Sequence, residues 1–205
     1  MTSAAEADDE TGQDARPGYG EGRDALLAAA VKVVARGGLR KLTYRSVAAE
    51  AGVTHGLVAH HFGSRDALLE QALQWVVRHS IKTSSLVPVS GRLEDFAATL
   101  PGLVSADPDL QAFQYELKLE AIRSPELRHH ADALYQTYRD AVREALACFA
   151  LSEELVDIVF AALEGLVFHQ VTSGDSRRTE EGVRALRRLL EAQREQASSS
   201  VPTAD

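Results

Sequence analysis

The stretch that decides the fold is "LTYRSVAAEAGVTHGLVAHHFGSRDALL", residues 42–69. Its apolar residues recur at helical spacing, and Gly52 interrupts the pattern after a first short segment. Thr43 is placed to cap a helix that Gly52 ends. Thr54 is placed to cap a second short helix, and Ser64 a longer third one. The stretch therefore predicts two short helices joined by a tight turn, which is a helix-turn-helix.

Nearly all of the chain after residue 22 has the same helical periodicity. The segment "RDALLAAAVKVVARGG" predicts a first helix that ends at a glycine pair. Further helices are predicted over about 92–104, 108–123, 125–149 and 177–196, and from Ser152 to the turn "TSGDS". Asp107 and Ser124 each precede a proline, which is the usual start of a helix. No segment alternates at the period of a strand, so the fold class is all-α.

Composition and the order of residues bear on where the protein is located. Apolar residues make up 45% of the 205 residues, and the single cysteine excludes an internal disulfide. The acidic N-terminal segment lacks the order of a signal peptide, and "LVDIVFAALEGLVFHQV" is interrupted by acids and short for a membrane span. A cytoplasmic protein that does not enter the membrane is expected.

The net charge of −8 conceals an asymmetry along the chain. Residues 1–19 hold five acids and one base, residues 20–66 hold seven bases and four acids, and residues 67–205 hold 14 bases and 21 acids. The middle block is therefore +3 on an otherwise acidic chain. This pattern indicates that one part of the molecule meets an anion.

The second helix of the predicted pair suits the major groove of DNA. Thr54, Gly56 and Ala59 are small and keep the helix slim. Apolar residues on both helices would hold the pair together, because a helix this short does not persist alone. DNA phosphates and base edges are the predicted ligands of this element.

The same residues carry a family resemblance. "LTYRSVAAEAGVTHGLVAHHFGSRDALL", preceded by "AAVKVVARGG", resembles the DNA-binding domain of the tetracycline-repressor (TetR) family over about residues 23–70. The resemblance implies an N-terminal three-helix DNA-binding domain at 21–70 and a C-terminal helical ligand-binding and dimerisation domain at 71–197. An acidic tail at 1–20, expected to be disordered, and a tail at 198–205 complete the predicted organisation.

The resemblance also assigns DNA contacts. Residues at the start of the second helix would read bases, and those around the first helix would lie near the backbone. In that family two aromatic residues commonly precede the His-Phe pair, where this chain has Ala59 and His60. His60 is expected to replace one of them at a phosphate, and Arg65 to contact another phosphate at the following helix start. The predicted DNA-binding residues are Thr43, Tyr44, Arg45, Thr54, His55, Gly56, Leu57, His60 and Arg65.

The two C-terminal helices predict self-association. "SEELVDIVFAALEGLVFHQVTSG" is apolar nearly all round, and the last helix carries an apolar stripe. Two adjacent helices with surplus apolar surface indicate a homodimer closed by a four-helix bundle, which would read a palindromic operator. The predicted interface residues are Leu163, Val167, Val183, Leu186 and Leu190.

The middle helices are expected, by the same resemblance, to enclose a pocket for a small-molecule inducer that releases the repressor from DNA. The candidate lining residues are Phe96, Leu100, Phe113, Glu116, Tyr135, Tyr138, Phe168 and His169. Glu120 and Glu164 are further polar positions on apolar helices. The sequence does not identify the effector.

Two alternatives stay open. The chain could be an all-α enzyme or ligand carrier with an incidental helix-turn-helix, or a helical adaptor whose residues 23–70 bind protein. No HExxH, Gly-x-Ser-x-Gly or paired-cysteine motif supports catalysis. His55 and His60 are five residues apart, a poor spacing for sharing one metal ion on a helix. The prediction is a ligand-responsive DNA-binding repressor that is not an enzyme and needs no metal or cofactor.

Overall fold

The computed structural model describes residues 19–83, 86 and 90–199, and these residues form helices and connecting turns without a strand. The prediction of an all-α fold is therefore confirmed. The acidic tail predicted at 1–20 falls almost wholly outside the described residues, as does the C-terminal tail from residue 200. The last helix reaches Ser199, slightly beyond the predicted end of the second domain.

The N-terminal unit consists of four helices and one turn. They are α1 (Tyr19–Gly37), the 3-10 turn η1 (Leu39–Lys41), α2 (Tyr44–Ala51), α3 (His55–Phe62) and α4 (Arg65–Thr83). Thr43 and Ser46 form a reciprocal capping box at the start of α2, and Gly52 ends that helix in the left-handed region. Ser64 Oγ accepts a hydrogen bond from the Ala67 amide and caps α4. These three predicted boundaries are correct.

The residues described after α4 form five further helices and two short turns. They are η2 (Leu93–Asp95), α5 (Leu100–Ala106), α6 (Pro108–Arg123), η3 (Pro125–Leu127), α7 (Arg128–Cys148), α8 (Leu155–Ser173) and α9 (Ser176–Ser199). Asp107 Oδ1 accepts a hydrogen bond from the Leu110 amide, so the predicted start of α6 is correct.

Three predicted helix starts are wrong, and one of them is that at Ser152, because α8 begins only at Leu155. The helix expected at 92–104 begins only at Leu100, because Ala97 adopts a positive φ of 52° and breaks the run after η2. Pro101 then occupies the first turn of α5, where a missing amide is harmless. Ser124 and Pro125 begin the 3-10 turn η3, and α7 starts three residues later.

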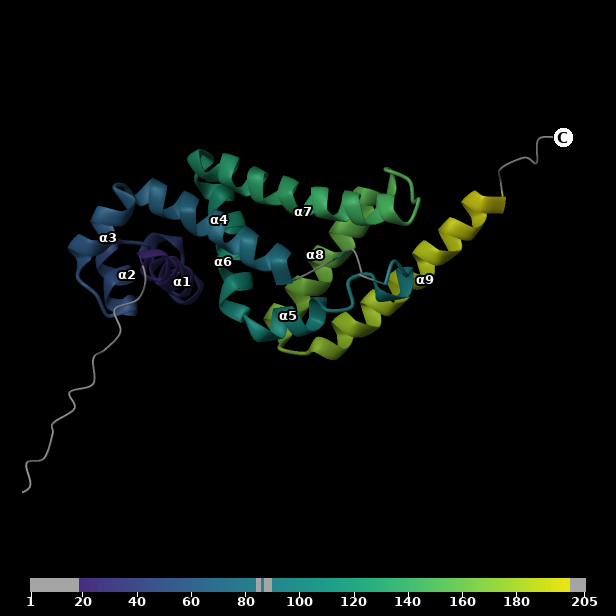
Figure 1. Cartoon of the computed structure of the whole chain (residues 1–205), viewed down its shortest axis with the longest axis horizontal. Coiled ribbons are helices and arrows are strands. Elements are labelled where there is room, and N and C mark those ends of the chain that lie inside the picture. The colour runs from purple at the N-terminus through teal and green to yellow at the C-terminus, as the bar shows by residue number, and fades with distance from the viewer. Residues whose placement is uncertain (1–18, 84–85, 87–89, 200–205) are drawn as a thin grey trace, which may run out of the picture.

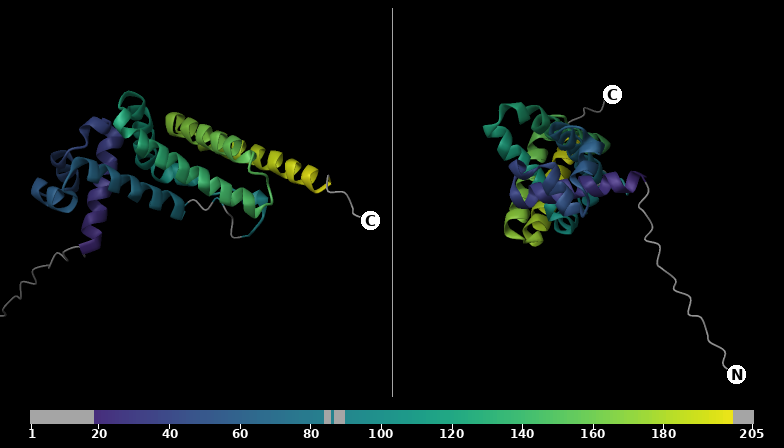
Figure 2. Two further views of the ribbon diagram at one scale, coloured as in Figure 1. Left: turned by 90° about the horizontal axis from the view of Figure 1, so that it is seen from above. Right: turned by 90° about the vertical axis from the view of Figure 1, so that its left-hand side faces the viewer.

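The helices pack around two apolar cores. The first fills the N-terminal unit but also includes Phe113 and Leu117 of α6 and Leu134 of α7. The second lies between α7, α8, α9 and the turn at residues 93–97. In Figure 1 the short helices α2 and α3 lie at one end of the molecule, and α9 extends from the other. Figure 2 shows α8 and α9 side by side along the bundle. Packing therefore crosses the boundary at residue 70.

Helix α8 has 19 residues and is apolar enough, by length and composition, to cross a membrane. The sequence-based argument that this segment is too short is therefore wrong. Its two carboxylates are nevertheless paired with neighbouring helices: Asp157 with Arg139 of α7, and Glu164 with Lys118 of α6. Helices α7 and α9 also pack along α8. The apolar composition of α8 therefore suits a central helix of a helical bundle.

Candidate DNA-reading helix and ligand pocket

Helix α3 presents most of its residues to solvent. Val58 and Phe62 are buried in the first core and anchor the helix, while Leu57 is 41% exposed. His55 and His60 are also exposed. At Gly56 a β-carbon would meet nothing within 4 Å, so the space beside the helix start is open. A slim helix with an exposed N-terminal half has the shape that enters a major groove.

The residues predicted to read bases, and His60, which is predicted to contact a phosphate, are all exposed on or just before α3. This surface, which we call the α3 face, consists of Thr54, His55, Gly56, Leu57 and His60. Thr54 occupies the N-cap position of α3, but its side chain makes no capping hydrogen bond. In the first turn, the Leu57 amide instead donates to the Thr54 carbonyl at 3.1 Å.

Exposed cations also occur in the elements that precede α3, with Lys41 in η1 and Arg45 in α2. Lys41 and Arg45 are exposed, and within the described residues neither takes part in an ion pair. Other bases of the N-terminal unit are engaged within the protein: Arg36 pairs with Glu50 and with Asp109 of α6. The +3 charge of this segment is therefore available to an anion only in part, through exposed bases such as Lys32, Lys41 and Arg45.

Two predicted DNA-binding residues make contacts within the protein, although Arg65 is also exposed. Arg65 donates from Nε to the Leu42 carbonyl at 2.9 Å and from Nη2 to the Leu39 carbonyl at 3.0 Å. The ring of Tyr44 packs against the first core, and its hydroxyl is buried. Arg65 thus ties the start of α4 to the turn before α2, a role that sequence alone did not indicate.

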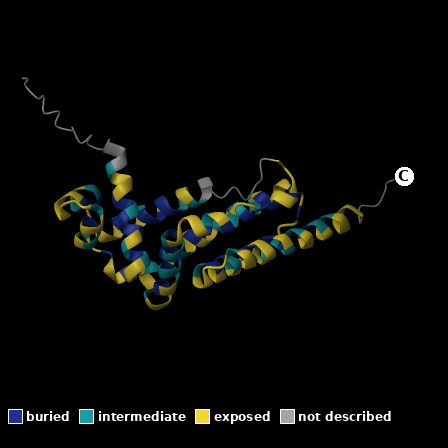
Figure 3. Cartoon of the chain, turned by 90° about the horizontal axis from the view of Figure 1, so that it is seen from below, coloured by how far each residue is buried: buried dark blue, intermediate teal, exposed yellow. Residues whose placement is uncertain are grey.

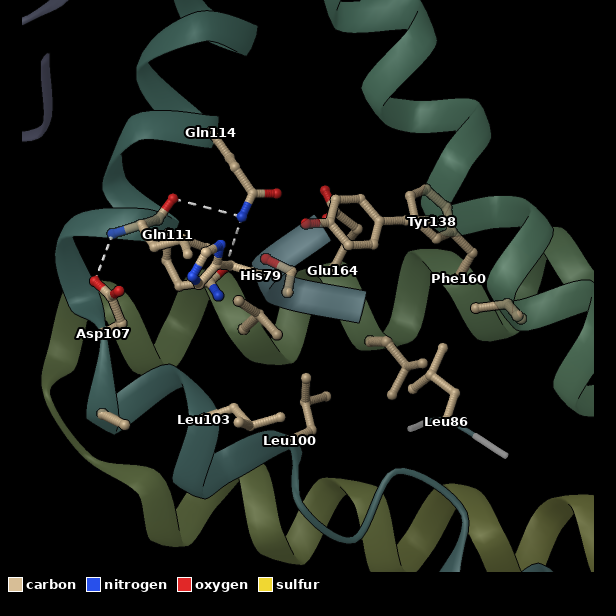
Figure 4. Close-up of a pocket in the computed structure, with 16 residues that line it drawn as sticks. His79, Leu86, Leu100, Leu103, Asp107, Gln111, Gln114, Tyr138, Phe160 and Glu164 are labelled. Carbon is tan, nitrogen blue, oxygen red and sulfur yellow. Dashed lines mark hydrogen bonds between the residues drawn. The ribbon is translucent and has the colours of Figure 1, made fainter. Parts of the chain in front are cut away.

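A cavity of about 200 Å³ lies between α4, α5, α6, α7 and α8. Its walls are mostly apolar, and Figure 4 shows Leu100 and Leu103 of α5 facing polar side chains of α6 and α7 across it. The lining residues are His79, Ser80, Leu86, Leu100, Leu103, Ala106, Asp107, Leu110, Gln111, Gln114, Tyr138, Val142, Phe160, Leu163, Glu164 and Val167. A small, mostly apolar cavity with a few convergent polar groups is typical of a ligand site.

The structure brings only two of the eight predicted pocket residues, Leu100 and Tyr138, to this cavity. Phe96 and Phe113 are fully buried in the two cores. Tyr135 and Phe168 are largely exposed and stack edge-on against Phe160 and Tyr115, respectively.

The remaining two candidates, Glu116 and His169, also lie elsewhere. Glu116 faces the N-terminal unit, where its carboxylate lies 3.3 Å from the position of a β-carbon at Gly38. His169 is exposed on α8. These misassignments arose because helical periodicity gives the apolar faces of a helix but not which neighbour each face meets.

Tyr138 and Glu164 on the polar wall of the cavity were among the positions named from the sequence, whereas the two glutamines of that wall were not. Gln111 and Gln114 are three residues apart on α6, and Gln114 Nε2 makes long hydrogen bonds of 3.4 Å to Leu110 O and Gln111 Oε1. The signal that could have identified them is a pair of glutamines at helical spacing on an otherwise apolar face.

Tyr138 supplies a hydroxyl to the same wall. It lies close to Ser80 and Gln114 but has no partner at full hydrogen-bonding geometry. Burial, with a smaller contribution from the nearby Glu164 carboxylate, raises the pKa of Tyr138 to about 12. The hydroxyl is therefore protonated at neutral pH and able to donate a hydrogen bond.

The carboxylate of Glu164 already forms an ion pair with a lysine. Lys118 Nζ lies 2.5 Å from Glu164 Oε2, and Lys118 itself is not part of the cavity lining. The sixteen lining residues include no lysine or arginine. The polar wall is thus dipolar, with no fixed positive charge on its surface.

Helix α6 contacts the cavity with one face and the N-terminal unit with another. Leu110, Gln111 and Gln114 face the cavity. The other face meets the N-terminal unit, through Phe113 and Leu117 in the first core and through ion pairs of Asp109 and Glu120 with Arg36 and Arg40. A displacement of α6 by a bound molecule would therefore act directly on α1 and η1.

The five predicted dimer residues are buried within the protomer. Leu163, Val183, Leu186 and Leu190 belong to the second core, and Val167 is 8% exposed. The residues predicted for the dimer interface are therefore packed within a single chain, because the apolar stripes of α8 and α9 face each other. Gly182 makes this close approach possible: a β-carbon there would lie 2.3 Å from a Leu166 methyl.

A helix-turn-helix joined to a helical domain that encloses a cavity defines a class of regulatory proteins. The sequence pattern described as "Bacterial regulatory proteins, tetR family" matches residues 26–72. A second pattern, "Tetracyclin repressor-like, C-terminal domain", matches residues 91–192. The chain belongs to the tetR family, which confirms the resemblance found in the sequence.

Two curated relatives share part of this chain. The HTH-type transcriptional regulator BetI of Agrobacterium fabrum is 31% identical over 111 residues, which is 52% of this chain and 54% of the relative. The HTH-type transcriptional repressor KstR2 of Rhodococcus jostii is 28% identical over 141 residues, 69% of this chain and 57% of the relative. The chain thus spans little more than half the length of these relatives.

Solved structures are similar over most of the chain. A TetR-family member from Streptomyces coelicolor A3 is 28% identical with a TM-score of 0.65, covering 83% of this chain and 98% of that one. The multidrug binding protein EbrR, solved in complex with proflavin, is 27% identical with a TM-score of 0.51, covering 83% and 99%. The arrangement of helices is therefore that of the family.

Proposed function

We propose that this protein is a cytoplasmic, ligand-responsive DNA-binding repressor without catalytic activity. Membership of the tetR family supports a regulatory role, and one matched relative is named a transcriptional repressor. The α3 face supports DNA binding, because its exposed residues are backed by buried anchors and exposed cations occur in the elements that precede α3. The cavity supports a small-molecule effector, and EbrR provides a family precedent for ligand binding.

The observation that carries the proposal is the double role of α6. One face of this helix lines the cavity, and the other packs on α1 and η1 of the N-terminal unit. A ligand that fits one position of α6 better than another would shift the population of N-terminal orientations. Such coupling explains how an effector could weaken DNA binding without touching α3.

A homodimer is part of the proposal, since one short reading helix binds DNA weakly and two read a palindrome. The surface that would form it differs from the predicted one. An apolar stripe on α8, which we call the α8 stripe, consists of Ile158, Ala161, Gly165 and Phe168 at spacings of three and four. Ile158 is 66% and Phe168 46% exposed.

The neighbouring helix extends this surface. Leu189 of α9 is 69% exposed, and α9 packs directly along α8. In Figure 3 much of the outer side of the C-terminal bundle, including α9, is coloured as exposed, and buried residues lie on the inner side. Two copies meeting through α8 and α9 would form a four-helix bundle and cover the apolar residues.

The decisive experiment is selection of bound sequences from random duplexes by the full-length protein. A repressor of this kind should enrich a palindrome whose half-sites are one or more helical turns apart. Binding should weaken steeply with salt, because phosphate contacts release counterions. Enrichment of no sequence, together with salt-independent binding, would refute the DNA-binding role.

The alternatives predict a different result. A ligand carrier, an enzyme or a helical adaptor would have no salt-dependent affinity for duplex DNA. The exposed cations Lys41 and Arg45 in the elements before α3 favour the repressor, because an adaptor surface would gain nothing from them in particular.

A further inference from the structure

The chemistry of the cavity identifies a class of effector more closely than the family does. We propose that the cavity binds a small uncharged molecule with an apolar body and one hydroxyl-like group, seated against Tyr138 and Gln114. This inference rests on the proposed function, because it names the effector of that same site.

Size is the first argument. The cavity holds about 200 Å³. An engineered cavity of roughly 150 Å³ in another protein accepts benzene, so this one suits a molecule of about ten non-hydrogen atoms. Leu100, Leu103 and Phe160 offer that molecule apolar contacts on one side.

Hydrogen bonding is the second argument. The Tyr138 hydroxyl is buried without a partner at bonding geometry, and an unpaired buried donor is costly. Gln114 is also buried, and its side-chain nitrogen makes only long bonds within α6. Figure 4 shows both side chains beside Glu164 on one wall of the cavity. A hydroxyl group on the ligand would accept from Tyr138 and donate to the Gln114 oxygen.

Charge is the third argument. An anion would find no lysine or arginine among the lining residues, and would meet the carboxylates of Glu164 and Asp107. The basic side chain in the lining is His79, which stacks on Trp75 and has its Nδ1 3.2 Å from the Trp75 carbonyl oxygen. A cation would find the Glu164 carboxylate already paired with Lys118, and Asp107 capping α6. Neither sign gains a partner that offsets its desolvation, so an uncharged molecule fits best.

The test uses three probes with one apolar body: hydrocinnamyl alcohol, hydrocinnamyl amine and hydrocinnamate. Binding to the full-length protein is measured by calorimetry at neutral pH, where the amine is a cation and hydrocinnamate an anion. The alcohol should bind at least tenfold more tightly than either charged probe. A tighter amine or carboxylate, or no binding of any probe, would overturn the proposal.

Variants locate the site. Tyr138→Phe should weaken the alcohol about tenfold by removing one hydrogen bond. Tyr135→Phe removes a hydroxyl from the same helix outside the cavity and should leave affinity unchanged. Glu164→Gln would leave Lys118 unpaired and should raise the relative affinity of hydrocinnamate. Equal effects of the two tyrosine variants would show that the alcohol binds elsewhere.

The failure of this inference can be told from failure of the proposed function. If the protein selects a palindromic duplex but prefers a charged probe, the repressor stands and the effector class is wrong. If the alcohol binds through Tyr138 but no duplex is selected, the cavity assignment stands and the regulatory role fails.

Discussion

The Arg40 guanidinium in η1 lies 3.3 Å from the Glu120 carboxylate in α6, joining the N-terminal unit to the helix that lines the cavity. Glu120 is almost completely buried and also receives hydrogen bonds from Arg123. The hydrogen bonds from Arg123, and then from Arg40, lower the pKa of Glu120. Desolvation of the carboxylate raises the pKa, but the hydrogen bonds outweigh it. The carboxylate is thus held ionised between the two units.

This pair predicts a specific pH dependence of stability. Because folding lowers the pKa of Glu120, its stabilising effect is complete above the unfolded value of about 4.3 and is lost as pH falls through the folded value. The melting temperature of Glu120→Gln should lie below that of the wild type by a constant amount from pH 8 to about pH 5, and the gap should close below about pH 4.

Differential scanning calorimetry across this pH range measures the gap. Glu126→Gln, at an exposed position in η3, provides the control and should match the wild type throughout. A gap that persists unchanged at pH 3 would mean that the ionised carboxylate is not the source of the stabilisation.

Arg65→Ala should act mainly on stability. The variant loses two hydrogen bonds from a charged donor to the carbonyls of Leu42 and Leu39, worth roughly 1 to 3 kcal/mol together. Urea unfolding should show this loss, and Arg65→Lys should restore it only partly because an ammonium cannot span both carbonyls. The original assignment to a phosphate contact would be favoured if stability were unchanged and the salt dependence of DNA binding were reduced.

Arg45 and His55 should contribute differently to DNA binding. Arg45→Ala should weaken binding to all duplexes and reduce the salt slope by about one, as for a lost phosphate contact. His55→Ala should leave the slope nearly unchanged and relax the preference at one base position of each half-site. Fluorescence anisotropy at several salt concentrations separates the two effects, with Arg178→Ala on the distant α9 as the control.

Ile158→Glu should dissociate the dimer. A carboxylate within the proposed interface would be buried without a partner, at high cost. Sedimentation velocity should show a monomer. The affinity for a complete palindrome should fall about a hundredfold, because a monomer carries only one α3 helix.

The control for this variant is Ile122→Glu, which places the same charge at a position 72% exposed on α6. It should sediment like the wild type. Dissociation by both variants, or by neither, would argue against the α8 stripe as the interface.

The sequence by itself determined the local structure of this protein. Caps such as Thr43 and Asp107, and stops such as Gly52, act within one helical turn, so they can be identified from neighbouring residues. The exposed side of α3 was equally accessible, since Val58 and Phe62 mark the buried side of a very short helix.

Only the tertiary structure decided which helix faces meet. The predicted dimer residue Leu163 turned inward to the core and the cavity, and Glu116, predicted for the pocket, turned toward Gly38. Arg65 likewise donates hydrogen bonds to backbone carbonyls of residues more than twenty positions earlier in the chain. A helical pattern gives the direction of a side chain around its own axis, whereas its partner depends on the packing of helices that are distant in sequence.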